Sequence, residues 1–177
     1  MMATRMSCFL YKYLTFIKLS IKIVKNELSK NEGSDNMNID FARKLELAYH
    51  QQCKNLCNEF HLKQTGFDIL MFLGNNPQYK HAKDIVEIRK IKANLVSIHV
   101  DQLVDQGYLS RIDVPGDRRK VELVLNKKAN DVIKKGKAFQ NHFFSSLFSD
   151  IDEKHQKIFK ETLELMEKNI DCLLEEK

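Results

Sequence analysis

The sequence predicts a mainly α fold that carries one small β-hairpin, an α+β class, and three observations support this. Apolar residues recur at helical spacing through most of the region from residue 37 to residue 177. Two runs between residues 108 and 125 alternate instead with the two-residue period of a strand. Pro115 and Gly116 stand between these runs, and this pair is typical of a tight turn.

Residues 1–36 are predicted to lie outside this fold, as an extension upstream of a translation start at Met37 or as a poorly ordered arm. The apolar segment 8–24 carries Lys12, Lys18 and Lys22, which argue against a membrane span. The segment also lacks the uninterrupted apolar centre and the cleavage site of a signal peptide. A basic arm that touches DNA or a membrane surface is the alternative, but no membrane partner is expected. With no disulfide framework among the four cysteines, we expect a cytoplasmic protein with free thiols.

A first helix is expected from about residue 39 to residue 61, with an apolar stripe formed by Phe41, Leu45, Ala48, Tyr49, Leu56 and Phe60. Roughly opposite this stripe lie His50, Cys53, Cys57 and His61. They cannot all bind one ion, because eleven helical residues span about 16 Å. A pair or trio could bind zinc or copper with a further ligand, and Cys57 could sense oxidants. The favoured interpretation is plain surface or interface residues, so no metal or cofactor is predicted.

Three shorter helices are predicted in the middle of the chain. Residues 62–73 form an apolar run, and residues 84–89 form a short amphipathic segment. Val96, Val100, Leu103 and Val104 then recur as a buried helical stripe. Gly107 follows at the position where a helix commonly ends in a left-handed residue.

The predicted hairpin follows at once. Tyr108, Ile112 and Val114 share one face of the first strand, and the second strand carries the equivalent set Val121, Leu123 and Leu125. Positive charge gathers beyond the turn, at Arg118, Arg119 and Lys120. Two helices followed by a basic hairpin indicate a winged helix-turn-helix, in which the second helix enters the major groove of duplex DNA.

This interpretation assigns DNA contacts residue by residue. Four side chains at the start of the second helix are expected to face bases: Lys92, Asn94, Ser97 and Ile98. The predicted hairpin is the wing of this motif. On the wing, Arg118 or Arg119 would enter the minor groove, and Arg111 and Lys120 would meet phosphates. Asp117 would orient the arginines. Residues 80–120 contain nine Lys/Arg against six Asp/Glu, a local excess of +3 that suits a polyanion.

The segment from residue 84 to residue 126 resembles the MarR family of transcriptional regulators. Ile85-Val86 occupies the place of the family's Leu-Ala pair, and Leu103 and Gly107 close the recognition helix. The run Asp117-Arg118-Arg119 matches the wing signature of the family. The resemblance implies a winged helix-turn-helix that regulates transcription. The resemblance rests on the order and spacing of these motifs and not on any single one.

Two departures from the family pattern stand out. Arg89 replaces an aliphatic residue, so the first helix is expected to pack differently there. Asn126 replaces the threonine of the family's Leu-Thr pair, and we expect it to cap the next helix as an acceptor.

Two further helices are expected after residue 126. The first carries the stripe Val132, Gly136, Phe139, Phe143 and Leu147. The second opens near Asp150, with Asp152 and Glu153 in its first turn, and carries the stripe Ile158, Phe159, Leu163, Met166, Ile170 and Leu173. A small winged helix cannot bury all these stripes, so a second copy of the chain is expected to cover them. A monomeric bundle is the alternative.

The predicted organisation is an extension at 1–36, a dimerisation helix at 37–61, the winged helix-turn-helix at 62–125, and dimerisation helices at 126–177. The resemblance implies a homodimeric repressor, rather than an activator, that binds double-stranded DNA at a palindromic operator and responds to a small aromatic effector. The sequence contains no motif typical of an enzyme. The alternatives are a thiol- or metal-responsive sensor on the same scaffold, and a winged-helix adaptor that binds protein.

Overall fold

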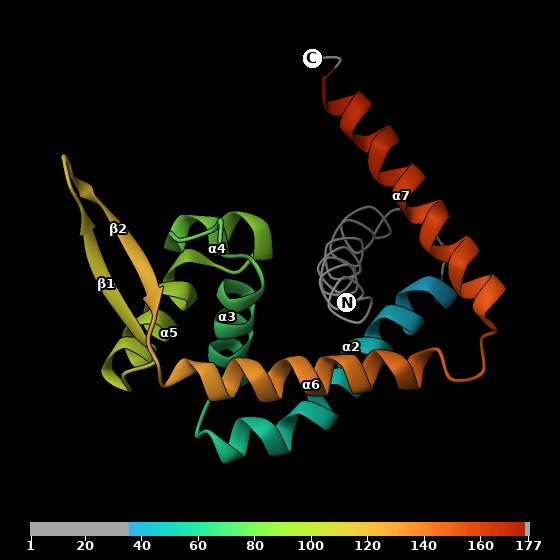
Figure 1. Cartoon of the computed structure of the whole chain (residues 1–177), viewed down its shortest axis with the longest axis horizontal. Helices are drawn as coiled ribbons and strands as arrows, with labels where there is room; N and C mark the ends of the chain where they lie inside the picture. Colours follow the sequence, from blue (N-terminus) through green and yellow to red (C-terminus); the bar gives the residue numbers. More distant parts are fainter. Residues whose placement is uncertain (1–35, 176–177) are drawn as a thin grey trace. The chain divides into compact units, whose positions relative to one another are not determined.

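The computed structural model describes residues 36–175, and the predictions made for the N-terminal extension fall outside this range. The chain divides into two compact units, of which the first ends at Gln140 and the second begins at Asn141. Six helices and one hairpin make up the described residues (Figure 1): α2 (Asn36–Glu59), α3 (Gln64–Asn75), α4 (Ala82–Arg89), α5 (Ala93–Asp105), β1 (Leu109–Val114), β2 (Asp117–Leu125), α6 (Ala129–Leu147) and α7 (Glu153–Glu175). The predicted class, mainly α with one hairpin, is confirmed. Among the described residues, no helix combines the length and apolar character needed to cross a membrane.

Helix α3 forms the centre of the first unit because it is apolar on nearly all sides. Its fully buried side chains include Phe67, Ile69, Leu70, Met71 and Phe72. The buried stripe of α5, with Val96, Val100 and Leu103, joins the same core cluster as these residues. A helix that is apolar all round is stable in water only when its neighbours cover it, and α2, α5, α6 and the hairpin provide that cover.

The close approach of α6 to α3 depends on Gly136. A Cβ atom at this position would lie 2.3 Å from Met71 Sδ and 3.2 Å from Phe67 Cε2. Both neighbours are fully buried, so neither side chain can move away without disturbing the core.

Replacing Gly136 with Ala is therefore expected to lower the free energy of unfolding by about 1–3 kcal/mol through overpacking, despite the better helix propensity of alanine. Urea denaturation measures this change. Asn130→Ala at an exposed position of α6 provides the matched control. A Gly136→Ala protein as stable as this control would contradict the packing.

Local interactions and backbone conformations determine where the two helices of the helix-turn-helix begin and end. Asp84 Oδ2 accepts hydrogen bonds from the backbone N–H groups of His81 and Lys80, at 2.8 and 3.0 Å, and so caps α4. Lys90 ends α4 in the left-handed region, with φ of 52°. Gly107 has φ of 77° just after α5, which confirms the helix end predicted there.

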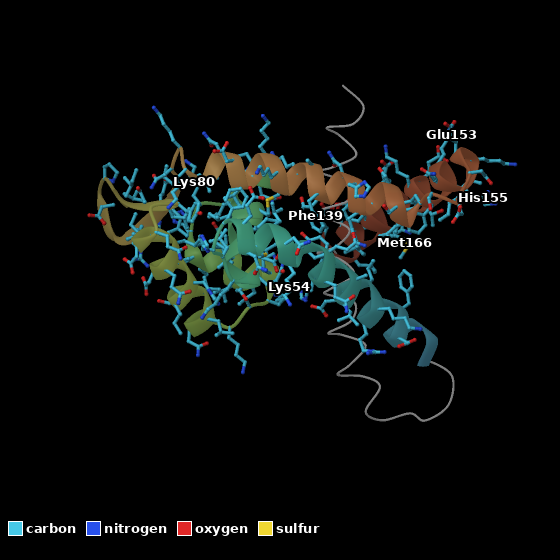
Figure 2. All side chains as sticks on the ribbon, turned by 90° about the horizontal axis from the view of Figure 1, so that it is seen from below. Lys54, Lys80, Phe139, Glu153, His155 and Met166 are labelled. Carbon is cyan, nitrogen blue, oxygen red and sulfur yellow. The ribbon has the colours of Figure 1, made fainter. Side chains whose placement is uncertain are left out.

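The hairpin is antiparallel, but the predicted face of its first strand is wrong. Leu109 pairs with Leu125 and Arg111 pairs with Leu123, so the inward face of β1 carries Leu109, which is 1% exposed. Ile112, expected on the half-buried face, is 50% exposed. The reason is parity, because a one-residue offset turns every side chain of a strand to the other face. The N–H of Leu123 also donates to the carbonyl of Lys80 at 2.7 Å, which ties the wing to the segment that leads into α4. Lys80 is labelled in Figure 2.

Asn126 does not cap α6 as expected. Its side-chain amide donates to the carbonyl of Gly107 at 3.1 Å, and its Oδ1 accepts from the Ser110 hydroxyl at 2.8 Å. The amide of an asparagine can donate as well as accept, and both uses here close the base of the wing against the end of α5. In the second unit, Asp152 does cap the last helix, since its Oδ1 accepts from the N–H of His155 at 2.9 Å.

Candidate nucleic-acid interface

Helix α5 turns one polar face outward. Val96, Val100 and Leu103 anchor the opposite face in the core, and this burial leaves Asn94, Ser97, Ile98 and Asp101 exposed. Ile98 is 50% exposed although it is apolar. Lys92 is exposed at the position before the helix, where the unpaired backbone N–H groups and the helix dipole favour negative charge. Lys92 and the three α5 residues predicted to face bases thus lie on one accessible surface.

The wing lies beside this surface. Arg111 on β1 forms an ion pair with Asp101 on α5, and the turn places Gly116 in the left-handed region at φ of 87°. The structure places Asp117, Arg118 and Arg119 at the start of β2, while Lys120 is exposed on the same strand. Arg111, predicted to meet phosphates, therefore has a carboxylate partner in this state.

An apolar hollow of about 340 Å³ separates the wing from the helices. Its wall is formed by Val86 of α4, Val96 and Val100 of α5, and Val121 and Leu123 of β2. The recognition helix and the wing therefore share apolar side chains along this hollow.

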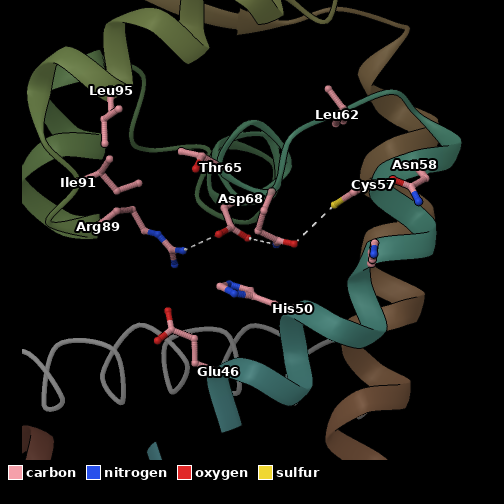
Figure 3. Close-up of a pocket in the computed structure, with 12 residues that line it drawn as sticks. Glu46, His50, Cys57, Asn58, Leu62, Thr65, Asp68, Arg89, Ile91 and Leu95 are labelled. Atoms are coloured by element: carbon pink, nitrogen blue, oxygen red, sulfur yellow. Dashed lines mark hydrogen bonds and ion pairs between the residues drawn. The ribbon is translucent and has the colours of Figure 1, made fainter. Parts of the chain in front are cut away.

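A larger cavity of about 590 Å³ lies between α2, α3 and the connection from α4 to α5 (Figure 3). Arg89 enters it and pairs with Asp68 of α3 at 3.9 Å. The two side chains are only 6% and 13% exposed. Arg89, which stands where the family has an aliphatic residue, is thus held in a largely buried ion pair. His50 of α2 also lines the cavity, and its Nε2 is buried without a hydrogen-bond partner.

The two cysteines of α2 were expected on its surface, and this expectation is wrong. Cys53 is 0% exposed and Cys57 is 5% exposed, and both belong to the core cluster. A thiol is small and weakly polar, so it packs like an apolar side chain. Their sulfur atoms are 3.5 Å apart, and Cys57 also donates to Oε1 of Gln64 at 3.6 Å.

The four candidate metal ligands, His50, Cys53, Cys57 and His61, do not converge. His50 faces the cavity, while His61 is exposed in the turn that follows α2, with φ of 53°. Within residues 36–175, no group of three or more His, Cys, Asp or Glu side chains is placed to hold a metal ion. The two thiols alone remain close together.

The pKa values of the two thiols are shifted in opposite directions. The hydrogen bond from Cys53 lowers the pKa of Cys57, against the opposing effect of burial. The same hydrogen bond, together with burial, raises the pKa of Cys53. Cys57 is therefore the sulfur that carries a negative charge more readily.

Comparison with known proteins supports the winged-helix interpretation. Residues 62–120 match the model of the MarR family. No curated protein matches the sequence. Among solved structures, a MarR transcriptional regulator from Methanosarcina mazei Go1 is 20% identical, with a TM-score of 0.63 over 76% of this chain and 96% of that chain.

Two further structures share the fold. The MepR–DNA complex of S. aureus is 16% identical, with a TM-score of 0.51 over 72% of this chain and 96% of that chain. NadR in complex with 4-hydroxyphenylacetate is 16% identical, with a TM-score of 0.60 over 77% of this chain and 94% of that chain. The family match and the shared architecture confirm the expected resemblance to MarR-family winged-helix regulators.

Proposed function

We propose, from the MarR-family winged helix that this chain carries, that the protein is a homodimeric, sequence-specific DNA-binding repressor of transcription whose affinity for DNA responds to a small effector. The observation that carries the proposal is the outward polar face of α5 beside a basic wing, joined by the Arg111–Asp101 ion pair. A solved relative in complex with DNA supports the same use of this fold. The protein would act by covering a palindromic operator.

In this proposal, Lys92, Asn94, Ser97 and Ile98 face the bases of the major groove. An exposed isoleucine suits contact with a thymine methyl group, which a polar side chain would not provide. Arg118 or Arg119 enters the minor groove, Asp117 orients these arginines, and Lys120 meets a phosphate. Arg111 exchanges Asp101 for a phosphate when DNA binds, because an ion pair between two half-exposed groups contributes little.

The second unit supports the homodimer. Helix α7 has no buried residue, and its large apolar side chains are 41–65% exposed, namely Ile158, Phe159, Leu165, Met166, Ile170, Leu173 and Leu174. A continuous apolar stripe of this kind marks an interaction surface. The proposed occupant is α7 of a second copy, because a symmetric dimer buries the same stripe on both chains.

The large cavity is the proposed effector site. It offers a buried cation, Arg89, and an unpartnered ring nitrogen on His50, so it can bind a small aromatic molecule that bears an acidic group. NadR was solved with a small aromatic acid, 4-hydroxyphenylacetate, on a similar fold. Because the cavity touches the start of α5 through Leu95, a ligand that binds one state more tightly would shift the recognition helix.

Arg89→Met is expected to weaken binding of small aromatic carboxylates by about tenfold or more, because a buried charged hydrogen bond is lost. Isothermal titration calorimetry with benzoate-type acids and their neutral amides measures this loss. Lys54→Met, at an exposed residue that also lines the cavity, is the control for a general loss of positive charge. Equal affinities for acids and amides in the unaltered protein would contradict the acidic ligand class.

The direct test of the proposed function is selection of bound duplexes from a random pool. We expect a palindromic consensus, with half-sites about one helical turn apart. Affinity for the consensus should exceed affinity for random duplexes and should fall steeply with salt. A protein-binding adaptor would select no sequence and would bind no duplex even in dilute buffer.

A further inference from the structure

The wing is held against the start of α4 along one edge of β2. The N–H of Leu123 donates to the carbonyl of Lys80 at 2.7 Å, and the ring nitrogen Nδ1 of His81 lies 3.0 Å from the carbonyl oxygen of Val121. A carbonyl oxygen can only accept, so Nδ1 carries the hydrogen of this second bond. The side chain of His81 is thus a donor to a strand that follows 40 residues later in the chain.

The ring of His81 takes the place of a missing backbone donor. Alternate residues of a strand turn their backbone polar groups to the same edge, so the carbonyl of Val121 lies on the edge at which Leu123 meets Lys80. A further strand would supply a backbone N–H to this carbonyl. Here α4 begins at Ala82, and the main chain turns into a helix directly after the first bond. The histidine side chain instead satisfies the carbonyl of half-buried Val121, which would otherwise lack a partner there.

Capping of α4 does not account for a histidine at this position. His81 is the N-cap residue of α4, where Ser, Thr, Asp and Asn are the favoured residues. The carboxylate of Asp84 accepts from the backbone N–H groups of His81 and Lys80, at 2.8 and 3.0 Å. The contact that distinguishes His81 from a short N-cap residue is therefore its bond to the wing.

This bond lies where the wing meets both α5 and the proposed path of DNA. The side chains of Val121 and Leu123 line the apolar hollow beside α5. Lys120, the neighbour of Val121, is exposed and is the proposed phosphate contact. Holding the carbonyl of Val121 therefore restricts the backbone that carries Lys120, and a preordered contact loses less conformational entropy when a ligand binds.

A second side-chain link between the same two segments is more exposed. Lys80 Nζ and Glu122 Oε2 are 3.5 Å apart, and the two side chains are 52% and 33% exposed. An ion pair in such a position contributes little, because water screens it. The half-buried ring of His81 is thus the side chain expected to hold the wing.

We propose that His81 is a positioning residue for the wing: its Nδ1–H group holds β2 at Val121 against the start of α4, and so sets the distance between the backbone contact of the wing and the base contacts of α5. The consequence for DNA binding rests on the proposed function above. The order of the wing in the free protein does not.

The substitutions His81→Ser and His81→Asn separate this role from capping. Serine and asparagine are comparably good N-cap residues, so both variants should keep α4 and should unfold at the same urea concentration. Only asparagine has an N–H donor at the branch position that Nδ1 occupies in histidine, so only His81→Asn can still donate to Val121. Glu122→Gln is the matched control, because it removes the exposed ion pair between the same two segments.

Amide hydrogen exchange, followed for each residue by NMR without DNA, tests the link itself. Exchange at Leu123, whose N–H donates to Lys80 beside His81, should be about tenfold faster in His81→Ser than in the parent protein, because the edge of β2 opens locally. Exchange at Phe67 in the core of α3 should not change. In His81→Asn and Glu122→Gln, exchange at Leu123 should stay within about twofold of the parent. Equal exchange at Leu123 in His81→Ser and the parent, or equally fast exchange in His81→Ser and His81→Asn, would overturn the assignment.

A double-mutant cycle with Lys120→Gln tests the consequence for DNA. In the parent and in His81→Asn, this change should lower affinity for the consensus duplex by about tenfold at low salt, since a dimer loses the phosphate contact in both half-sites. In His81→Ser, the same change should lower affinity by less than about threefold, because the wing no longer holds Lys120 at the phosphate. A purely structural role of His81 would leave the factor for Lys120→Gln unchanged.

The two measurements distinguish this inference from the proposed function. If the parent protein binds no duplex while exchange at Leu123 responds as expected, the proposed DNA function fails and the link between His81 and the wing stands. If the parent binds the consensus duplex and Lys120→Gln lowers affinity by the same factor in all three proteins, His81 does not position the wing for DNA, and this inference fails alone.

Discussion

Asn94→Ala is expected to weaken binding to the selected palindrome by about 30-fold or more while leaving affinity for random duplexes unchanged. Asn94 is exposed in the first turn of α5, and its Oδ1 accepts from the N–H of Leu95 at 2.9 Å. Its NH₂ group remains available to a base acceptor in the major groove. A good side-chain–base contact contributes about 1–3 kcal/mol, and a dimer makes it twice, once in each half-site.

Arg119→Ala is the matched comparison, because it removes a contact to the DNA backbone or minor groove instead of a base contact. It should weaken binding to all duplexes alike and should reduce the slope of log affinity against log salt by about one per half-site. Fluorescence anisotropy at several salt concentrations measures both variants. If Asn94→Ala lowers affinity for random duplexes as much as for the palindrome, α5 does not read bases through this residue.

The helices and the hairpin could be predicted because each has a repeating apolar pattern that a single sequence displays. The stripe of Val96, Val100 and Leu103 predicted the buried face of α5, and the glycine at 107 predicted where the helix ends; the structure confirms both. Boundaries of this kind depend on local chemistry. The resemblance to the MarR family rested on the same segment and is confirmed by the family match at 62–120.

The thiol pair was misplaced, whereas the buried ion pair depends on a contact between distant segments that no local pattern shows. Cys53 and Cys57 were expected opposite the apolar stripe of α2, but Cys53 follows Tyr49, and Cys57 follows Cys53, at the four-residue spacing of a helical stripe. Helix α2 is covered on this side by the core that contains α3. Arg89 departs from the family pattern in the sequence, but only the fold shows Asp68 beside it.

The wing shows a second kind of feature that the sequence pattern leaves undetermined, the face of a strand that turns inward. The two-residue period revealed a strand but did not show which side of it faces inward, since Tyr108 and Leu109 are both apolar and both buried. Pairing of Leu109 with Leu125 decides the question. Asn126 likewise offered both a donor and an acceptor, and only the approach of Gly107 and Ser110 shows which groups it binds.

Met166→Gln/Ile170→Gln in α7 is expected to raise the dissociation constant of the homodimer by about 100-fold or more. Both side chains are more than 40% exposed in the single chain and lie on one face of the helix, four residues apart. Burial of such a side chain contributes about 1.5–3 kcal/mol, and a symmetric interface buries each of them twice. Glutamine keeps a high helix propensity, so α7 itself should remain intact.

Sedimentation equilibrium measures the dissociation constant of the dimer. Affinity for the consensus duplex measures the consequence for DNA binding, because a single winged helix makes only half of the contacts. Glu164→Gln/Lys168→Gln is the matched control, since it places two glutamines on the opposite face of α7 without changing the net charge. The control should dimerise and bind DNA as the parent protein does. A parent protein that sediments as a monomer, or a Met166→Gln/Ile170→Gln protein that dimerises as tightly as the control, would show that this stripe binds something other than a second copy. In that case the two half-sites would have to be bridged by another surface, or the protein would read a single, non-palindromic site.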